Sequence, residues 1–412
     1  MSKQIETEKF LGIRYARANR FEKPIIVDYT ENFFDEIFDG KKQDFSRYGA
    51  CCPQNRTFYP ENENSMYFRE FRENLEFTYD EDCLFLNIFR PVLITTYDEF
   101  STDASKKLPV LIYIHGGSFT RGSASERPFD GSNLSSRGII VVTINYRLNI
   151  FGTYMGKNLM LYDMKAAIKW VYKYISYFGG NSENITLAGQ SAGAMSVQAL
   201  LLNEDISKIV KKSIMISGGG LLHGIYAPKN RIFAVSFYKS VEKDLKKRGL
   251  YALTATSQQL FESFHSVCKK RPVNATLMAV FPTFDECIVN KKNFSMKKAS
   301  LILKENGIKT IFSVTKDDLS PRSYLAKNAK KLSSLCNKIG IESCYVEFNH
   351  YIPSDGAEKE NIVDLRKGAW HSSDLWYFFG NLNQHTWRTF TAEDYEISEK
   401  MMCKVINFCK SF

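Results

Sequence analysis

Ser191 is the residue of this 412-residue chain whose sequence context most clearly indicates a reactive hydroxyl. It is the centre of GQSAG at 189–193, a G-x-S-x-G pentapeptide between the apolar run 185–189 and a helix-like stretch. The two glycines indicate a sharp strand-to-helix turn without room for side chains, which would hold Ser191 in a strained conformation. A serine hydroxyl needs a general base to act as a nucleophile, so further residues must accompany it. The alternative is a simple turn that matches the pentapeptide by chance.

A second candidate element is HGGSF at 115–119, directly after the apolar run PVLIYI. Consecutive glycines let backbone N–H groups approach a substrate carbonyl. We expect the N–H groups of Gly117, Ser118 and Ala192 to form an oxyanion hole, with Gly116 in support. The alternative is an ordinary turn at two glycines.

The acid and the base are expected after later strands, in the order serine, acid, histidine. Asp317 and Asp318 follow the apolar run 309–315, and His371 lies in a loop beyond the run 343–348. Of the six histidines, only His350, at a predicted strand end, rivals His371. The choice between Asp317 and Asp318 stays open at this point.

The elements that would position these residues are short apolar runs separated by helical patterns. Runs that are apolar on both faces are typical of strands buried in a parallel sheet. They cover residues 109–115, 139–145, 185–189, 213–217, 309–315 and 343–348. Strands that alternate with helices predict an α/β protein with a doubly wound sheet.

One helix is predicted within residues 161–180, where apolar residues recur at spacings of three and four. The apolar positions are Leu161, Met164, Ile168, Val171, Ile175 and Phe178. Gly179 and Gly180 stand where a C-cap belongs. Without internal repeats or low-complexity linkers, we expect one domain over 1–412, with a helical cap insertion at 222–305.

The net charge of +10 is uneven, since residues 205–332 hold 24 Lys and Arg against 9 Asp and Glu. A basic face could attract an anionic substrate, a membrane or nucleic acid. The lysines occur as scattered pairs without interleaved aromatic residues, so a solvated surface is the simpler interpretation. The chain begins without an apolar signal segment, and its apolar runs are too short to span a bilayer. We therefore expect a cytoplasmic protein without integral membrane association.

Many separate motifs resemble those of the type-B carboxylesterase family, in the same order along the chain. They are FLGIRYA (10–16), CPQ (52–54), EDCLFLN (81–87), HGGSF (115–119), NYRLNIFG (145–152), FGGNSENIT (178–186), GQSAGA (189–194), SG (217–218) and GAWHSSDLWYFFGN (368–381). The resemblance implies an α/β-hydrolase fold, a mostly parallel sheet flanked by helices, over nearly the whole chain. It also implies no metal or organic cofactor.

The resemblance implies site roles for individual residues. Ser191 would be the nucleophile, His371 the general base and Asp318 the acid, where the family usually has glutamate. Gln190 and Ser217 would support them, although Ser217 could equally be an ordinary strand-end serine. Only 53 residues separate Asp318 from His371, fewer than is usual in the family, and relatives normally continue past NFCKSF, which suggests a more open pocket or a weakened site.

The resulting expectation is a serine carboxylesterase that hydrolyses small to medium esters through an acyl-enzyme. A thioesterase, a lipase and a catalytically impaired binding homologue are the alternatives. The expected partner is a small-molecule ester rather than nucleic acid, and the expected assembly is a monomer or a weak homodimer.

Overall fold

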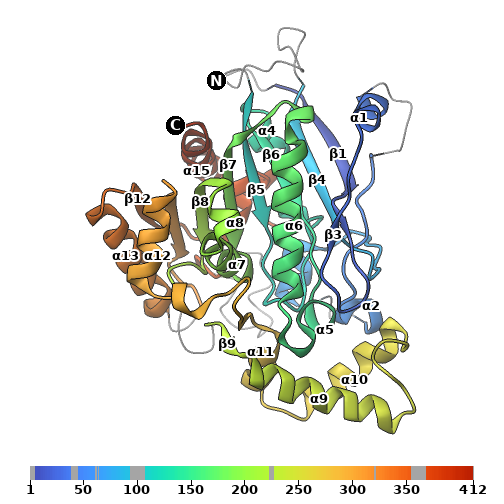
Figure 1. The fold of residues 1–412 in the computed structure, drawn as a ribbon. Helices are drawn as coiled ribbons and strands as arrows, with labels where there is room; N and C mark the ends of the chain where they lie inside the picture. The colour runs from blue at the N-terminus through green and yellow to red at the C-terminus, as the bar shows by residue number, and fades with distance from the viewer. Residues whose placement is uncertain are drawn as a thin grey trace.

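A central eight-stranded sheet organises the computed structural model, which describes residues 5–38, 45–60, 63, 65–92, 107–221, 227–319, 322–353 and 368–411 (Figure 1). The strand order is β1-β4-β6-β5-β7-β8-β11-β12. The strands are β1 (Thr7–Arg14), β4 (Phe85–Pro91), β5 (Leu108–Ile114), β6 (Ile140–Ile144), β7 (Gly180–Gln190), β8 (Val210–Ile216), β11 (Lys309–Thr315) and β12 (Ser343–Phe348). Two-stranded pairs join β2 (Ala16–Arg17) to β3 (Ile25–Ile26), and β9 (Lys229–Asn230) to β10 (Thr283–Phe284).

The six predicted strands are confirmed as β5, β6, β7, β8, β11 and β12, and all pairings among them are parallel. The edge formed by β1 and β4 is antiparallel and was not among the predicted strands. Because parallel strands end at one edge, the loops after β5, β7, β8, β11 and β12 begin at that edge, and these loops carry the candidate residues.

The sheet is covered on both faces, which explains the uninterrupted apolar character of its strands. Side chains alternate along β5, so Ile112 joins the core cluster that includes Trp170, while Tyr113 joins the cluster that includes Trp376. The first cluster lies beneath α6 (Leu159–Tyr174) and α7 (Ala192–Leu201), and the second beneath α14 (Leu375–Phe379) and α15 (Ala392–Lys410).

The predicted helix at 161–180 is observed as α6 and a following 3₁₀ turn at 175–178. All six of its predicted face residues are buried. Gly179 ends this segment with a φ of 80°, the left-handed geometry that favours glycine at a helix C-terminus. Apolar spacing and the terminal glycine therefore sufficed to locate this element.

The remaining helices are mostly short. They are α1 (Glu31–Phe38), α2 (Asn55–Phe58), α3 (Met66–Phe71), α4 (Ser132–Ser135), α5 (Asn149–Thr153), α8 (Glu204–Ser207), α9 (Arg231–Lys247), α10 (Ser257–Lys269), α11 (Val273–Val280), α12 (Met296–Glu305) and α13 (Arg322–Lys338). None of the helices in the described ranges has the length and apolar character needed to cross a bilayer.

The segment predicted as a cap insertion, 222–305, is largely helical where the structure describes it. Residues 222–226 lie outside the described residues, and α9, α10 and α11 gather at one end of the molecule (Figure 1). The architecture as a whole is the predicted α/β class, a large sheet flanked by helices.

Candidate active site

Ser191 lies between β7 and α7 with φ 54° and ψ −121°, a strained conformation for a residue with a side chain. A Cβ atom on Gly193 would lie 2.1 Å from the Ile114 carbonyl oxygen, and one on Gly189 would lie 2.6 Å from the Gly193 carbonyl carbon. The neighbouring backbones therefore leave space only for glycine at both positions, as the pentapeptide predicted. The turn is fixed further by a hydrogen bond of 2.8 Å from the Ser191 N–H to the Ile216 carbonyl.

The loop after β5 packs directly against this turn. A Cβ atom on Gly116 would lie 3.2 Å from the Ser191 Cβ, so the two backbones approach as closely as glycine permits. Gly117 and Ser118 have φ values of 103° and 55°. Among the described residues, no backbone carbonyl accepts a hydrogen bond from the N–H of Gly117 or Ser118. The N–H of Ala192, the first residue of α7, has no acceptor within its helix.

His115 supports this loop from beneath. Its ring is buried and stacks on Tyr146 with centroids 4.3 Å apart, and its Nδ1 lies 2.8 Å from the Gly116 carbonyl oxygen. Burial lowers the pKa of His115 to about 4, so the imidazole is neutral near pH 7. His115 therefore shapes the loop and does not enter the pocket.

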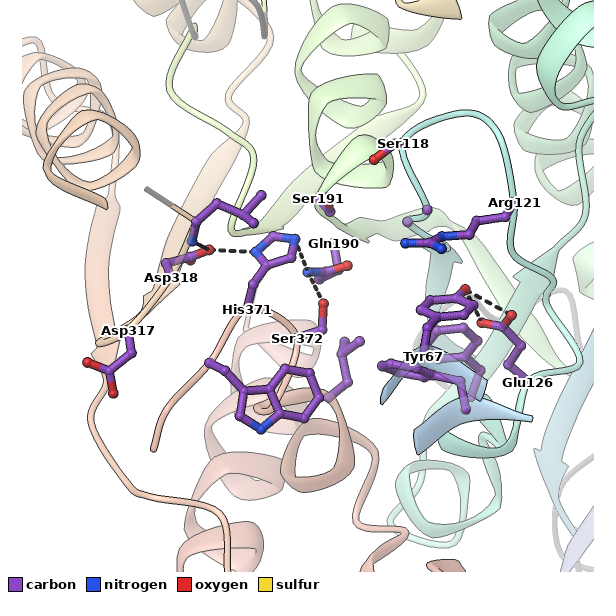
Figure 2. Close-up of a pocket in the computed structure, with 17 residues that line it drawn as sticks. Tyr67, Ser118, Arg121, Glu126, Gln190, Ser191, Asp317, Asp318, His371 and Ser372 are labelled. Carbon is purple, nitrogen blue, oxygen red and sulfur yellow. Dashed lines mark hydrogen bonds and ion pairs between the residues drawn. The ribbon is translucent and has the colours of Figure 1, made fainter. Parts of the chain in front are cut away.

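His371 and Asp318 are brought together although 53 residues separate them in the chain. The Nδ1 atom of His371 lies 2.5 Å from the Asp318 Oδ1 (Figure 2). Asp318 follows β11, and His371 lies in the loop before α14. Ser191, His371 and Asp318 all line one cavity of about 400 Å³. Figure 2 shows the His371 ring between Asp318 and Ser191.

Asp318 is held in its ionised form by several donors. Burial alone would raise the pKa of Asp318, but the hydrogen bond and charge of His371 outweigh burial and lower it. Ser217 donates to Asp318 Oδ2 at 2.5 Å, and the Leu319 N–H donates to Oδ1 at 2.8 Å. Ser217 is therefore a direct partner of Asp318 and not an isolated strand-end serine.

The two rival residues of the sequence analysis have other contacts. Asp317 accepts a hydrogen bond of 3.1 Å from the Ala369 N–H and turns away from His371 (Figure 2). Its carboxylate thus fastens the loop before His371. His350 pairs with Asp394 at 2.7 Å and is not among the residues that line the cavity.

Gln190 lies beside the imidazole. Its amide nitrogen is 3.2 Å from His371 Nε2 and donates to the Ser372 hydroxyl at 2.7 Å. An amide N–H that points at Nε2 needs an acceptor there, which favours the tautomer with its proton on Nδ1. In that tautomer, Nδ1 donates to Asp318, and Nε2 carries the lone pair that can accept a proton.

The opposite side of the cavity contains residues that the sequence analysis missed. Tyr67, Arg121 and Glu126 line it, together with the apolar side chains of Phe71 and Phe129. No described residue of the insertion, 227–305, lines this cavity. Arg121 follows Gly117 by four residues, but the charge of one arginine in a loop gave no signal of its position in the pocket.

Metal ions in proteins are bound by clusters of His, Cys, Asp and Glu side chains. Within the part of the chain that the structure describes, no group of three or more His, Cys, Asp or Glu side chains is arranged to hold a metal ion. On the Ser191 side of the cavity, the polar groups include a hydroxyl, an imidazole and a carboxylate.

Comparison with known sequences identifies relatives of this chain. The model of the carboxylesterase family matches residues 1–350. A para-nitrobenzyl esterase from Bacillus subtilis (strain 168) is 37% identical over 224 residues, which are 51% of this chain and 40% of that protein. Acetylcholinesterase-1 from Trittame loki is 39% identical over 221 residues, 51% of this chain and 35% of that protein. The matches thus span less than half of these curated relatives.

Comparison with solved structures supports the same assignment at the level of the fold. A PNB esterase structure superposes with a TM-score of 0.74 and 22% identity, and the match covers 100% of this chain and 88% of that one. The shared architecture is the α/β-hydrolase fold that the sequence motifs implied. The family model ends before His371, so the place of His371 in the site rests on its contact with Asp318. The chain belongs to the carboxylesterase family.

Proposed function

We propose that this protein is a serine carboxylesterase that hydrolyses small to medium carboxylic esters. The observation that carries the proposal is the convergence of three distant residues on one cavity. Ser191 lies on a strained turn there, and His371 is hydrogen-bonded through Nδ1 to the buried Asp318. Membership of the carboxylesterase family and the esterase names of the relatives support it.

The reaction would proceed through an acyl-enzyme. His371 Nε2 accepts the proton of Ser191 as the hydroxyl oxygen attacks the ester carbonyl, and Asp318 stabilises the resulting imidazolium. The N–H groups of Gly117, Ser118 and Ala192 hold the negatively charged oxygen of the tetrahedral intermediate. The C–O bond to the alcohol then breaks, and the alcohol leaves with the proton from His371. Water repeats these steps on the acyl-enzyme and releases the carboxylic acid.

Gln190 and Ser217 take supporting roles in this mechanism. Gln190 orients the His371 ring so that Nε2 faces the pocket. Ser217 stabilises the negative charge of Asp318 by donating a hydrogen bond to it. Neither residue transfers a proton. Gly116 supports the oxyanion loop because the absence of a side chain lets that loop contact the Ser191 turn.

The other assignments of the sequence analysis are part of the same proposal. We propose one domain over 1–412 with the segment 222–305 as its cap, a cytoplasmic location, and a monomer or weak homodimer. No nucleic-acid partner is proposed, since the paired lysines of 205–332 lack interleaved aromatic residues. A thioesterase or lipase would use the same three residues, but the names of the relatives favour the carboxylesterase.

Covalent labelling tests the proposal directly. A fluorophosphonate probe followed by peptide mapping should modify Ser191, and the Ser191→Ala variant should lose both the label and the hydrolysis of 4-nitrophenyl acetate. Loss of serine nucleophiles in comparable triads reduces kcat by about 10⁶-fold. Labelling at another residue, or equal hydrolysis by the variant, would overturn the assignment.

A further inference from the structure

The cavity has a second polar side, which the proposed mechanism does not use. Tyr67, Arg121 and Glu126 form this side, which we call the Arg121 side, across the cavity from His371 (Figure 2). Charged groups there would contact the substrate away from the bond that breaks, which is where an enzyme selects among substrates.

Arg121 is held in place while its guanidinium remains available. Its carbon Cζ lies over the Tyr67 ring, 4.4 Å from the centroid. The backbone N–H of Arg121 donates to the Gly117 carbonyl at 3.2 Å, which ties this part of the loop to the oxyanion segment. Among the described residues, none accepts a hydrogen bond or forms an ion pair with this side chain. Figure 2 shows the guanidinium extended over Tyr67 toward Gln190. The Arg121 side chain is exposed to solvent, so its guanidinium N–H groups can reach a ligand that enters the cavity beside the oxyanion loop.

Around Arg121, positively charged side chains outnumber negatively charged ones among the described residues. The positive charges of Arg56, Arg72 and Arg121 all act on the Glu126 carboxylate. This carboxylate accepts hydrogen bonds from the Tyr67 hydroxyl at 2.9 and 3.0 Å. Arg56 Nη1 lies 3.9 Å from the Glu126 Oε1, beyond hydrogen-bond distance. Burial raises the pKa of Glu126. Burial is also the largest cause that lowers the pKa of Arg72 to about 9, and repulsion from Arg56 and Arg121 lowers it further. An additional anion would relieve this repulsion.

A carboxylate is the anion that fits such a group best. The guanidinium is planar and can donate two parallel hydrogen bonds to the two oxygens of a carboxylate. Tyr67 beneath it, with Phe71 and Phe129, offers apolar surface for the chain or ring that joins the carboxylate to the ester. The cavity of about 400 Å³ has room for a small ester with such a second group.

We propose that this pocket selects esters that carry a second, ionised carboxylate, which Arg121 binds while Ser191 attacks the ester carbonyl. This inference rests on the proposed esterase function and adds a substrate class to it. The acidic group lies on the limb of the substrate that extends over Tyr67, and the reaction remains hydrolysis of one ester bond.

Matched substrates test the selection. The first pair is a mono-4-nitrophenyl ester of adipate and the same compound with its free carboxyl methylated, which differ in charge on the acyl limb. The second pair is 4-acetoxyphenylacetate and its methyl ester, which differ in charge on the leaving group. For at least one pair, we expect a higher kcat/KM for the anionic member. Equal or lower values for the anionic members of both pairs would overturn the proposal.

Variants of Arg121 connect this preference to the guanidinium. Arg121→Gln should reduce the ratio of anionic to neutral kcat/KM by about 2- to 5-fold, the usual effect of an ion pair at a solvent-exposed side chain. Arg121→Lys should retain part of the ratio, because the charge stays while the paired donors are lost. The matched control is Arg248→Gln, which removes a positive charge that is paired with Glu262 outside the pocket. An equal reduction in the control would assign the preference to overall charge and contradict the proposal.

A binding measurement separates this inference from the esterase proposal. Calorimetric titration of the full chain with adipic acid monoanilide, an amide that resists hydrolysis, should show tighter binding than with its methyl ester, and Arg121→Gln should abolish the difference. If 4-nitrophenyl esters are hydrolysed through Ser191 but neither ratio depends on Arg121, the inference fails and the esterase stands. If no ester is hydrolysed but the binding difference is present, the carboxylate site stands and the esterase proposal fails.

Discussion

Two carboxylates line the same cavity from opposite sides and have opposite properties. Asp318 and Glu126 are both buried, with 7% and 2% of their surface exposed, yet the pKa of Asp318 is lowered and that of Glu126 is raised. In both, burial is the largest influence and disfavours the charged form. The difference lies in what compensates for it.

Asp318 has close donors, and Glu126 has distant charges. His371, Ser217 and the backbone N–H of Leu319 all contact the Asp318 oxygens within 2.8 Å. The donor to Glu126 is the neutral Tyr67 hydroxyl, and the arginines near it do not reach hydrogen-bond distance in the contacts described. Short hydrogen bonds thus stabilise a buried charge better than several cations that lie farther away. The His371 side is arranged for proton transfer, whereas the Arg121 side retains unused positive charge.

Asp318→Asn should have the largest effect, because it removes the negative charge that stabilises the imidazolium. We expect kcat for 4-nitrophenyl esters to fall by about 10⁴-fold, as for other triads that lose this charge. Asp317→Asn is the matched control from the neighbouring position, and we expect it to reduce kcat by less than about tenfold, since Asp317 fastens only the loop. Steady-state kinetics measure both. A larger loss for Asp317→Asn would identify Asp317 as the acid.

Tyr67→Phe should have the next largest effect, on stability, since it removes the hydroxyl that donates to both oxygens of Glu126. A buried carboxylate without its donor should reduce the free energy of unfolding by about 2 kcal/mol. Tyr113→Phe is the control, because the buried Tyr113 hydroxyl has no hydrogen-bond partner among the described residues. Urea denaturation measures both variants. Equal stability of the two would show that Tyr67 does not compensate for the burial of Glu126.

Asp374 extends the comparison to a buried carboxyl without described hydrogen bonds to its side chain. Burial, together with the negative charge of Asp318, raises the pKa of Asp374 from 3.8 to about 7. Its folded form binds a proton more tightly than its unfolded form, so its contribution to stability is present below pH 3.8 and is lost as the pH rises to about 7.

Asp374→Asn should therefore remove a pH-dependent loss of stability. Relative to the variant, the parent chain should lose about 3 kcal/mol of unfolding free energy between about pH 4 and pH 7, and the loss should level off about one pH unit higher. Denaturant unfolding across this range tests the expectation. Parallel curves for the two proteins would contradict the raised pKa.

Ser217→Ala should have the smallest effect, because His371 and Leu319 still contact Asp318 in its absence. Loss of one hydrogen bond to a charged group predicts about a tenfold decrease in kcat. Ser213→Ala, on the same strand β8, removes a buried hydroxyl that has no partner in the described ranges and should leave kcat unchanged. If both variants behaved alike, the bond from Ser217 would have no part in the site.

Much of the architecture could be predicted because local sequence patterns report it. Six apolar runs located the parallel strands, and Gly189, Gly193 and Gly179 marked turns that exclude a side chain or need a positive φ. The antiparallel edge of β1 and β4 was missed because the prediction relied on uninterrupted apolar runs, and polar or charged residues interrupt both segments.

For the site, the sequence by itself determined Ser191, His371 and a pair of adjacent aspartates as candidates. Only the tertiary structure decided that Asp318, and not Asp317, contacts His371, because adjacent side chains in an extended segment point in different directions. It also decided that Tyr67, Arg121 and Glu126 face this cavity. Their role depends on contacts between segments far apart in the chain, and residue type alone does not encode the distance and burial that set the charge of a side chain.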